Sequence, residues 1–384
     1  MSKKEQGKAP VLRFKGFTDD WEQRKLGDIA NVYDGTHTTP DYQKNGIMFL
    51  SVENIDTLTS KKFITKSDYL ENYKHKPEYH DIFMTRIGSI GKTNILETHD
   101  PRAFYVSLAL IKPKDIDPYY LKYWLSSNTT QKEIWRRTLQ IAFPQKINKD
   151  EISKVQSSIS KSKNEQYNIG KLLNKIDHLL LLQQRKLDRL KEIRKSYLSK
   201  IFPNKRENRP SLKFNNLKNT SWKPHKLKDI VTNVETGKSK VKLQPKGKYP
   251  VLGSTSIIGY NDHYDYSGDF ILIARVGAYA GKMYRFSGSV KITDNTVFIQ
   301  SAYNTFLYYY LRNFNLKKLS FGSGQPLVKS SELKSLSILI PSSKEEIKAI
   351  SRLSIIFDNL INVQEKKVSS IRQIKKFLLQ NMFT

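Results

Sequence analysis

The sequence predicts an α+β protein with an internal pseudo-twofold repeat: two similar mixed α/β units, each followed by a long helix, with the two helices paired as an antiparallel coiled coil. Three observations predict this architecture. The second half of the chain repeats the first, both repeats end in heptads, and both contain short β-rich runs bounded by turn residues. The expected boundaries are 1–160 and 207–342 for the two units, and 161–206 and 343–384 for the two helices.

The repeat is visible as landmarks that recur in the same order. Trp21 and the run Lys25–Ile29 recur as Trp222 and Lys226–Ile230, 201 positions later. The segment 81–88 recurs as 269–277 with a one-residue indel, and each copy continues to a Gly-Lys pair. Residues 164–203 match 345–384 at an offset of 181. Because the offset shrinks along the chain, we expect the two units to share a frame and to differ in their loops.

Each unit mixes β-rich runs, such as 47–52, 270–274 and 296–299, with a few helices. The helix expected at 119–126 has a counterpart at 305–312, and both carry an aromatic stripe: Tyr120, Tyr123 and Trp124 in the first, Phe306, Tyr309 and Tyr310 in the second. These rings could stack on bases. Core packing is the favoured interpretation, because apolar neighbours at helical spacing fill the same face.

The long helices carry an a/d pattern of apolar residues. Tandem copies commonly pack about a pseudo-twofold axis, which for two helices gives an antiparallel pair. The predicted seam residues are Leu180, Gln183, Leu187, Leu190, Arg194, Tyr197 and Ile201 in the first helix and Phe357, Ile361, Gln364, Val368, Ile371, Lys375 and Leu378 in the second.

The polar seam residues suggest a register, because a polar residue at such a position usually fixes alignment at some cost in stability. Placing the axis between them sets Gln183 opposite Lys375 and Arg194 opposite Gln364, and it pairs Tyr197 with Ile361 and Ile201 with Phe357. The alternative is that the heptads face helices of other subunits. About thirty paired residues would span on the order of 45 Å, which suits half-sites roughly 34 Å apart on a duplex.

Composition points to a polyanionic partner. The 384 residues carry 66 Lys and Arg against 36 Asp and Glu, a formal net charge of +30 spread along the whole chain. Such a surface favours nucleic acid through counterion release, although charge alone does not separate DNA from RNA. There is no cysteine, which excludes thiolate chemistry and fits a reducing compartment. No apolar run resembles a signal peptide or a membrane span, so we expect a cytoplasmic protein without a membrane partner.

No catalytic or metal site is evident in the sequence. A base-flipping amino-methyltransferase would need an Asp/Asn-Pro-Pro-aromatic loop, and the chain has no Pro-Pro pair. Residues 88–93 (Gly-Ser-Ile-Gly-Lys-Thr) resemble a P-loop, but only two residues separate the glycines and the second copy lacks the Ser/Thr. A basic hairpin turn is the better interpretation. The seven histidines include no closely spaced pair with a carboxylate, so no metal is expected.

The alternation of two divergent units with two similar heptad helices resembles the specificity subunits of type I restriction-modification enzymes from end to end. The segment 21–35, the Asp…Arg-x-Gly…Gly-Lys stretches, the turn 322–326 and the helix ends Lys-Ile-Phe and Asn-Met-Phe are similar to that family. The resemblance implies target recognition domains that each read one half of a split, asymmetric site in double-stranded DNA. It also implies helices that set the spacing, two docked methyltransferase subunits and further restriction subunits. S-adenosylmethionine, ATP and Mg²⁺ would then belong to those partners alone.

Residues in loops at strand ends are the candidates for DNA contact, because small hydroxyl side chains can bond phosphates or base edges while Arg and Lys can bind guanine. Each could instead satisfy the backbone of its own turn. The candidates are Thr36, His37, Thr38, Arg86, Lys92, Lys238, Ser239, Ser254, Arg275, Lys282, Asn295 and Gln325. Gln140–Pro144 stands where the second unit has Gly322–Pro326, which leaves open whether the two turns have equal roles. A non-catalytic scaffold, or a specificity subunit of another restriction type, remains the alternative to the leading interpretation.

Overall fold

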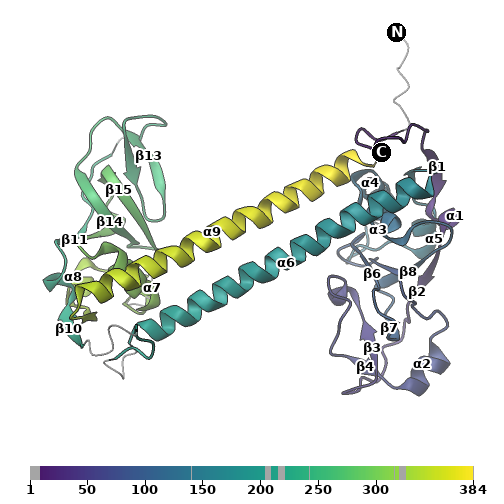
Figure 1. Ribbon diagram of the computed structural model, residues 1–384, viewed down its shortest axis with the longest axis horizontal. Coiled ribbons are helices and arrows are strands. Elements are labelled where there is room, and N and C mark those ends of the chain that lie inside the picture. Colours follow the sequence, from purple (N-terminus) through teal and green to yellow (C-terminus); the bar gives the residue numbers. More distant parts are fainter. Residues whose placement is uncertain are drawn as a thin grey trace, which may run out of the picture. The chain divides into compact units, whose positions relative to one another are not determined.

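The computed structural model describes residues 9–139, 141–203, 209–214, 221–241, 243–314, 316–319 and 326–383. It divides into two compact units: unit 1 contains residues 1–184 and 366–384, and unit 2 contains residues 185–365. Each unit therefore includes part of both long helices, α6 (Lys163–Ile201) and α9 (Lys344–Asn381) (Figure 1). No helix in the described ranges is long and apolar enough to cross a membrane.

Unit 1 is built on three small sheets. In the largest, β8 lies between β2 and β5, and β6 pairs with β5; in the second, β3 pairs with β4 and, in parallel, with β7; β1 pairs with β9 in the third. Its elements before α6 are β1 (Glu22–Lys25), α1 (Leu26–Ile29), β2 (Ala30–Asp34), β3 (Ile47–Leu50), η1 (Val52–Asn54), β4 (Phe63–Ile64), α2 (Lys66–Asn72), β5 (Ile82–Thr85), β6 (Thr93–Ile95), β7 (Arg102–Phe104), β8 (Leu108–Pro113), α3 (Pro118–Ser126), α4 (Asn128–Arg136), α5 (Lys149–Ser153) and β9 (Gln156–Ile159).

Unit 2 gathers the equivalent strands into one six-stranded sheet in the order β11-β16-β14-β15-β12-β13, with β10 and β17 paired separately. The β12–β15 pair is parallel and the other pairs are antiparallel. The elements are β10 (Trp222–Lys226), η3 (Leu227–Asp229), β11 (Asn233–Thr236), β12 (Tyr249–Leu252), β13 (Ile257–Asn261), β14 (Tyr266–Ala274), β15 (Met283–Ile292), β16 (Thr296–Gln300), α7 (Asn304–Phe314), η4 (Leu316–Leu319), α8 (Ser330–Ser335) and β17 (Ser337–Pro341).

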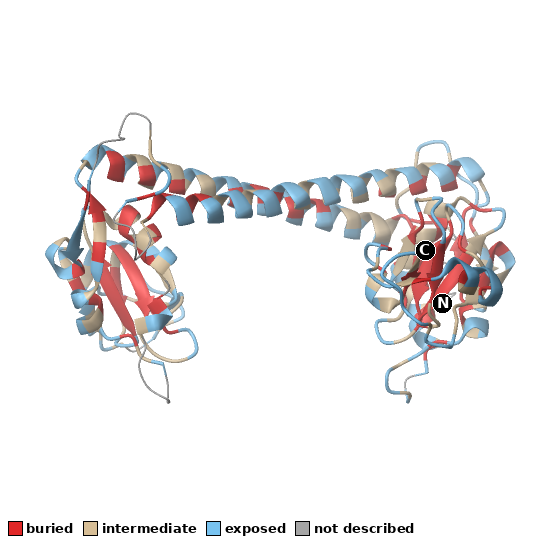
Figure 2. Ribbon diagram, turned by 90° about the horizontal axis from the view of Figure 1, so that it is seen from below, coloured by how far each residue is buried: buried red, intermediate tan, exposed pale blue. Residues whose placement is uncertain are grey.

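The aromatic stripes on α3 and α7 belong to the cores, as favoured from the sequence. Helix α3 begins where Asp117 accepts a hydrogen bond from the Tyr120 amide at 2.8 Å, with proline at the first helical position. Tyr120 and Trp124 are buried, and the Trp124 indole donates to the Ser158 carbonyl at 3.0 Å. Buried residues fill the interior of each unit (Figure 2). The stacking of bases on these stripes is therefore excluded.

The predicted heptad seam is confirmed. Each of its residues is buried or half-buried, whereas most of the positions between them on α6 and α9 are exposed. The two helices run antiparallel within each unit: Gln184 meets Arg372 in unit 1, and Lys191 meets Glu365 in unit 2. The predicted seam thus lies between the two helices of this chain.

The predicted register, however, is wrong by four to six residues, which is between one and two helical turns. Tyr197, predicted to meet Ile361, packs its ring 5.2 Å from that of Phe357. Lys375, predicted to lie opposite Gln183, forms an ion pair with Asp177 at 2.5 Å, and Arg194 forms one with Asp358 at 3.0 Å. The prediction assumed that polar seam residues face one another, but the two seam cations instead meet carboxylates beside the seam.

A second, shorter sequence repeat binds the C-terminal end of each long helix. Pro10–Phe14 and Pro210–Phe214 share the pattern Pro-x-Leu-basic-Phe. The Leu12 amide donates to the Asn381 carbonyl near the end of α9, and the Leu212 amide donates to the Lys200 carbonyl near the end of α6, both at 2.9 Å. We call these two segments the straps.

Candidate nucleic-acid interface

In unit 2, three of the predicted DNA-contacting residues lie together where β12, β14 and β16 reach one edge of the sheet. The carbonyl of Asn295 accepts hydrogen bonds from the Arg275 amide at 2.9 Å and from the Ser254 hydroxyl at 3.0 Å. The Arg275 guanidinium is half-buried and donates to the Asp294 carbonyl at 3.1 Å, while the Asn295 side chain is exposed. This edge therefore presents a guanidinium and an amide side by side, the two groups that can bind guanine and adenine edges in a bidentate manner.

The loop after β11 carries Lys238 and Ser239 to the same sheet. It begins at Gly237, where a Cβ atom would lie 2.4 Å from the Ile292 carbonyl oxygen, so only glycine fits this close approach. The Ser239 hydroxyl accepts from the Ile292 amide at 3.0 Å and donates to Asp265. Burial raises the pKa of Asp265, but the bonds from Ser239 and Lys291 outweigh it and hold that pKa below its usual value. Ser239 thus secures the loop, and Lys238 is left exposed.

Lys282 ends the turn between β14 and β15. Gly277 and Gly281 in this turn have φ angles of 83° and 82°, which explains their presence without any phosphate-binding role. The Lys282 ammonium is exposed and lies 5.1 Å from the centre of the Tyr279 ring. Gln325 lies outside the described residues.

In unit 1, the loop after β2 holds Thr36, His37 and Thr38. The Thr36 amide donates to the Phe104 carbonyl at 3.1 Å, and the Thr36 hydroxyl oxygen accepts from the Thr38 amide at 3.2 Å. His37 and Thr38 are exposed. Thr36 therefore shapes the loop, while the two following side chains are accessible to a ligand.

Arg86 is placed differently from its counterpart Arg275. It is buried, with 7% of its surface exposed, and it is paired with Asp34 and donates to the Ile147 carbonyl at 3.1 Å. In unit 2 the position of Asp34 is taken by Thr236, so Arg275 has no carboxylate there. Lys92, at the end of the β5–β6 turn, is exposed. Lys92 is thus an accessible cation at this edge of unit 1, and Arg86 is held by protein groups.

Two exposed apolar residues were missed from the sequence. Ile141 and Phe143 are 101% and 103% exposed, in the loop that the Gln145 carbonyl attaches to the Gly88 amide at 2.9 Å. This loop lies at the turn that also carries Lys92. Only the unusual composition of 140–144 at the place of a Gly-rich turn could have indicated it.

Among the described residues, no group of three or more His, Asp or Glu side chains is placed to hold a metal ion. Apart from Ile141 and Phe143, the exposed side chains named above at these edges carry hydroxyl, amide, imidazole or cationic groups, which suit binding to phosphates and base edges.

The family model of the type I restriction modification DNA specificity domain matches the chain twice, at residues 18–192 and 219–373. The chain belongs to this family. A specificity subunit described for the type I restriction enzyme MjaX of Methanocaldococcus jannaschii is 26% identical over 95% of this chain and 93% of its own length. A Haemophilus influenzae specificity subunit is 29% identical over 31% of this chain and 33% of its own length.

Solved structures of the same family share the fold of this type I specificity subunit. The S subunit of M. genitalium superposes with a TM-score of 0.71 at 16% identity, covering 98% of this chain and 99% of that one. A chain from a structure of type I restriction-modification complex assembly gives a TM-score of 0.51 at 12% identity, covering 96% and 98%. The two domain matches each contain one globular unit and most of its following helix.

Proposed function

We propose that this specificity subunit selects the DNA target of a type I restriction-modification complex, with each unit reading one half of a bipartite, asymmetric site. The observation that carries the proposal is the duplication of the strand-end loops. Gly35–Thr38 and Gly237–Ser239, and the turns ending in Lys92 and Lys282, occupy equivalent places in two units of one specificity family. The different residues in these loops would give each unit a different half-site. Catalysis, with its S-adenosylmethionine, ATP and Mg²⁺, would belong to partner subunits.

An apolar strip on the long helices supports docking of two copies of one partner. In unit 1, Leu179 and Leu182 of α6 and Ile374 of α9 are 42%, 59% and 52% exposed. With Leu180 at heptad position a and Gln183 at position d, and Lys375 at position a of α9, these residues occupy g and c positions. They lie on the flank opposite the e positions that carry Asp177 and Gln184, so the strip is separate from the polar helix contacts. An exposed apolar row on a folded surface commonly marks an interface.

Unit 2 carries the same strip at an offset of 181, with Leu360, Val363 and Ile193 exposed by 48%, 66% and 45%. Two equivalent strips on one chain fit two identical partners, and we propose that these are methyltransferase subunits. Restriction subunits would join them.

The strip is tested by placing a charge on it. Leu182→Asp should reduce the complex to one methyltransferase subunit, and Leu182→Asp with Val363→Asp to none, measured as mass by light scattering after co-expression with the neighbouring genes. Ser369→Asp adds the same charge on the other flank of α9 and should leave the stoichiometry unchanged. A double variant that still binds two methyltransferase subunits would refute docking at this strip.

DNA selection is tested by mapping adenine methylation across a plasmid with long-read sequencing. The co-expressed complex should methylate a split motif with a fixed gap. Replacing residues 1–160 by the first unit of another specificity subunit should change one half of that motif only. A change in both halves, or an unsplit motif, would refute the proposal that each unit reads one half-site.

A further inference from the structure

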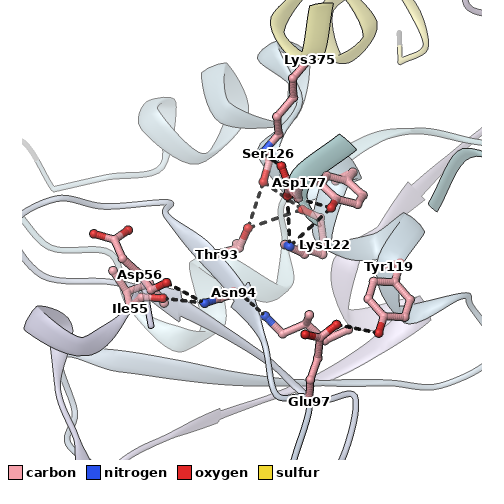
Figure 3. A network of polar contacts seen from close by, with 12 residues as sticks. Ile55, Asp56, Thr93, Asn94, Glu97, Tyr119, Lys122, Ser126, Asp177 and Lys375 are labelled. Carbon is pink, nitrogen blue, oxygen red and sulfur yellow. Dashed lines mark hydrogen bonds and ion pairs between the residues drawn. The ribbon is translucent and has the colours of Figure 1, made fainter. Parts of the chain in front are cut away.

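A half-buried carboxylate in unit 1 connects three helices. Asp177 of α6 accepts a hydrogen bond from the Tyr123 hydroxyl of α3 at 2.8 Å and pairs with the Lys375 ammonium of α9 at 2.5 Å (Figure 3). Lys122 of α3 adds a longer contact of 3.4 Å to the same carboxylate. We call this arrangement of tyrosine, aspartate and cation a joint.

Unit 2 contains a second joint in which the two long helices exchange roles. Asp358 now belongs to α9, and it accepts from the Tyr309 hydroxyl of α7 at 2.7 Å and pairs with Arg194 of α6 at 3.0 Å. Asp177 and Asp358 are related by the offset of 181, as are Arg194 and Lys375. The duplication of all three partners, in two units whose loops have diverged, indicates that the joint serves both ends of the helix pair.

The apolar seam does not choose a register by itself. The register expected from the sequence also matched apolar residues with one another, for example Tyr197 with Ile361, yet the helices are displaced from it by between one and two turns. A strict seven-residue repeat offers such near-equivalent alignments. The contact between Lys191 and Glu365 is 49% and 46% exposed, and exposed pairs of this kind contribute little.

The joints differ from that exposed pair in both burial and geometry. The side chains of Asp177 and Asp358 are 22% and 24% exposed, and those of Lys375 and Arg194 are 28% and 16% exposed. Sliding one helix by a turn would separate each cation from its carboxylate in a poorly solvated place, which is strongly unfavourable. The tyrosine of each joint also fastens the same carboxylate to the globular part of its own unit.

We propose that Asp177 and Asp358 are positioning residues that select the register of α6 and α9 and thereby set the gap between the two DNA half-sites. This inference rests on the proposed function of the two units. One helical turn is about 5.4 Å long and one base pair rises about 3.4 Å, so a slip of one turn corresponds to a change of roughly one to two base pairs in the gap.

The test removes the charges while keeping the packing. The neutral variant combines Asp177→Asn, Asp358→Asn, Lys122→Met, Lys375→Met and Arg194→Met, so that no poorly solvated charge of either joint is left without its carboxylate and each tyrosine keeps an acceptor. One-ended variants carry only the changes of unit 1 or only those of unit 2. The control, Lys191→Gln with Glu365→Gln, removes the exposed pair between the same helices. Each is co-expressed with the methyltransferase genes, and the methylated motif is mapped.

We expect the neutral variant to keep both half-site sequences and to methylate sites with two or more gap lengths that differ by one to two base pairs. The one-ended variants and the control should keep the single wild-type gap, because one joint suffices to hold the register. Retention of a single unchanged gap in the neutral variant would overturn the proposal.

A neutral variant that does not fold, judged by circular dichroism, would be replaced by a register reporter. The chain has no cysteine, so pairs of introduced cysteines at Lys191 with Glu365, and at Lys195 with Glu365, distinguish the native register from one shifted by a turn. In an Asp177→Asn and Asp358→Asn background, cross-linking of the second pair supports the proposal, and cross-linking of the first pair alone overturns it. Absence of any split motif in the wild type would instead refute the proposed function.

Discussion

Replacing Arg13 by alanine should lower the free energy of unfolding of unit 1. Arg13 lies in the first strap and donates to both carboxylate oxygens of Glu165, at 2.7 and 2.9 Å. The Glu165 side chain is fully buried, and its other bonds come from neutral groups, the Trp21 indole at 3.0 Å and the Ser160 hydroxyl at 2.5 Å. Without Arg13 a buried carboxylate loses the cation that pairs with it, a change that typically costs about 3–5 kcal/mol.

Because two neutral donors remain, we expect the lower end of that range, about 3 kcal/mol. For a unit of this size the loss corresponds to a fall of roughly 6–12 °C in Tm. Thermal unfolding of the full chain followed by circular dichroism measures it, with Lys15→Ala as the control because Lys15 is an exposed cation of the same N-terminal segment. If Arg13→Ala and Lys15→Ala shift Tm equally, the strap does not anchor unit 1 through this ion pair.

Three further predictions follow from the same structure. Burial raises the pKa of Glu165, but the bonds from Arg13 and from neutral donors outweigh it and hold that pKa below its ordinary value of 4.5. The ionised Glu165 therefore stabilises the folded state above about pH 4.5, and this contribution is lost as the pH falls through the lower folded-state pKa. Glu165→Gln should accordingly flatten the acid side of a plot of the urea midpoint against pH. Arg275→Ala should weaken DNA binding by about 1–3 kcal/mol, and titrations at several salt concentrations should show a slope of log K against log salt that is lower by about one. Arg86→Ala should instead lower Tm and leave that slope nearly unchanged, because Arg86 is paired within the protein. The reverse pattern would contradict the assignment of Arg86 to the fold. Gly237→Ala should cost about 1–3 kcal/mol of stability and displace the Lys238 loop, seen as weaker DNA binding, because its Cβ would meet the Ile292 carbonyl; unchanged binding and stability would show that the loop can move aside.

The architecture could be predicted from the sequence because it depends on repeated, period-bound signals. The aromatic stripe of α3 is an example: Tyr120 and Trp124 recur at helical spacing among apolar neighbours, and both are core residues. The seam residues could be predicted for the same reason, because a heptad pattern indicates which face of a helix is buried.

The register and the roles of the basic residues could not be predicted in this way. The register depends on Asp177 and Asp358, which lie beside the seam and carry no periodic signal. Arg86 and Arg275 occupy equivalent places in the repeat, and only the residue facing each one, Asp34 in unit 1 and Thr236 in unit 2, separates a buried structural arginine from an accessible one. Such differences come from contacts between distant segments, which a single sequence does not state.

The two straps bear on how this kind of protein can change its target. Each fastens to the end of a long helix through the same backbone bond, Leu12 to Asn381 and Leu212 to Lys200. A genetic exchange with one crossover in a strap and another beyond the following helix would transplant a unit together with a matching junction at both borders. New combinations of target half-sites could therefore arise by exchange of whole units, and the exchanged unit would need to pack only against the long helices of the recipient chain.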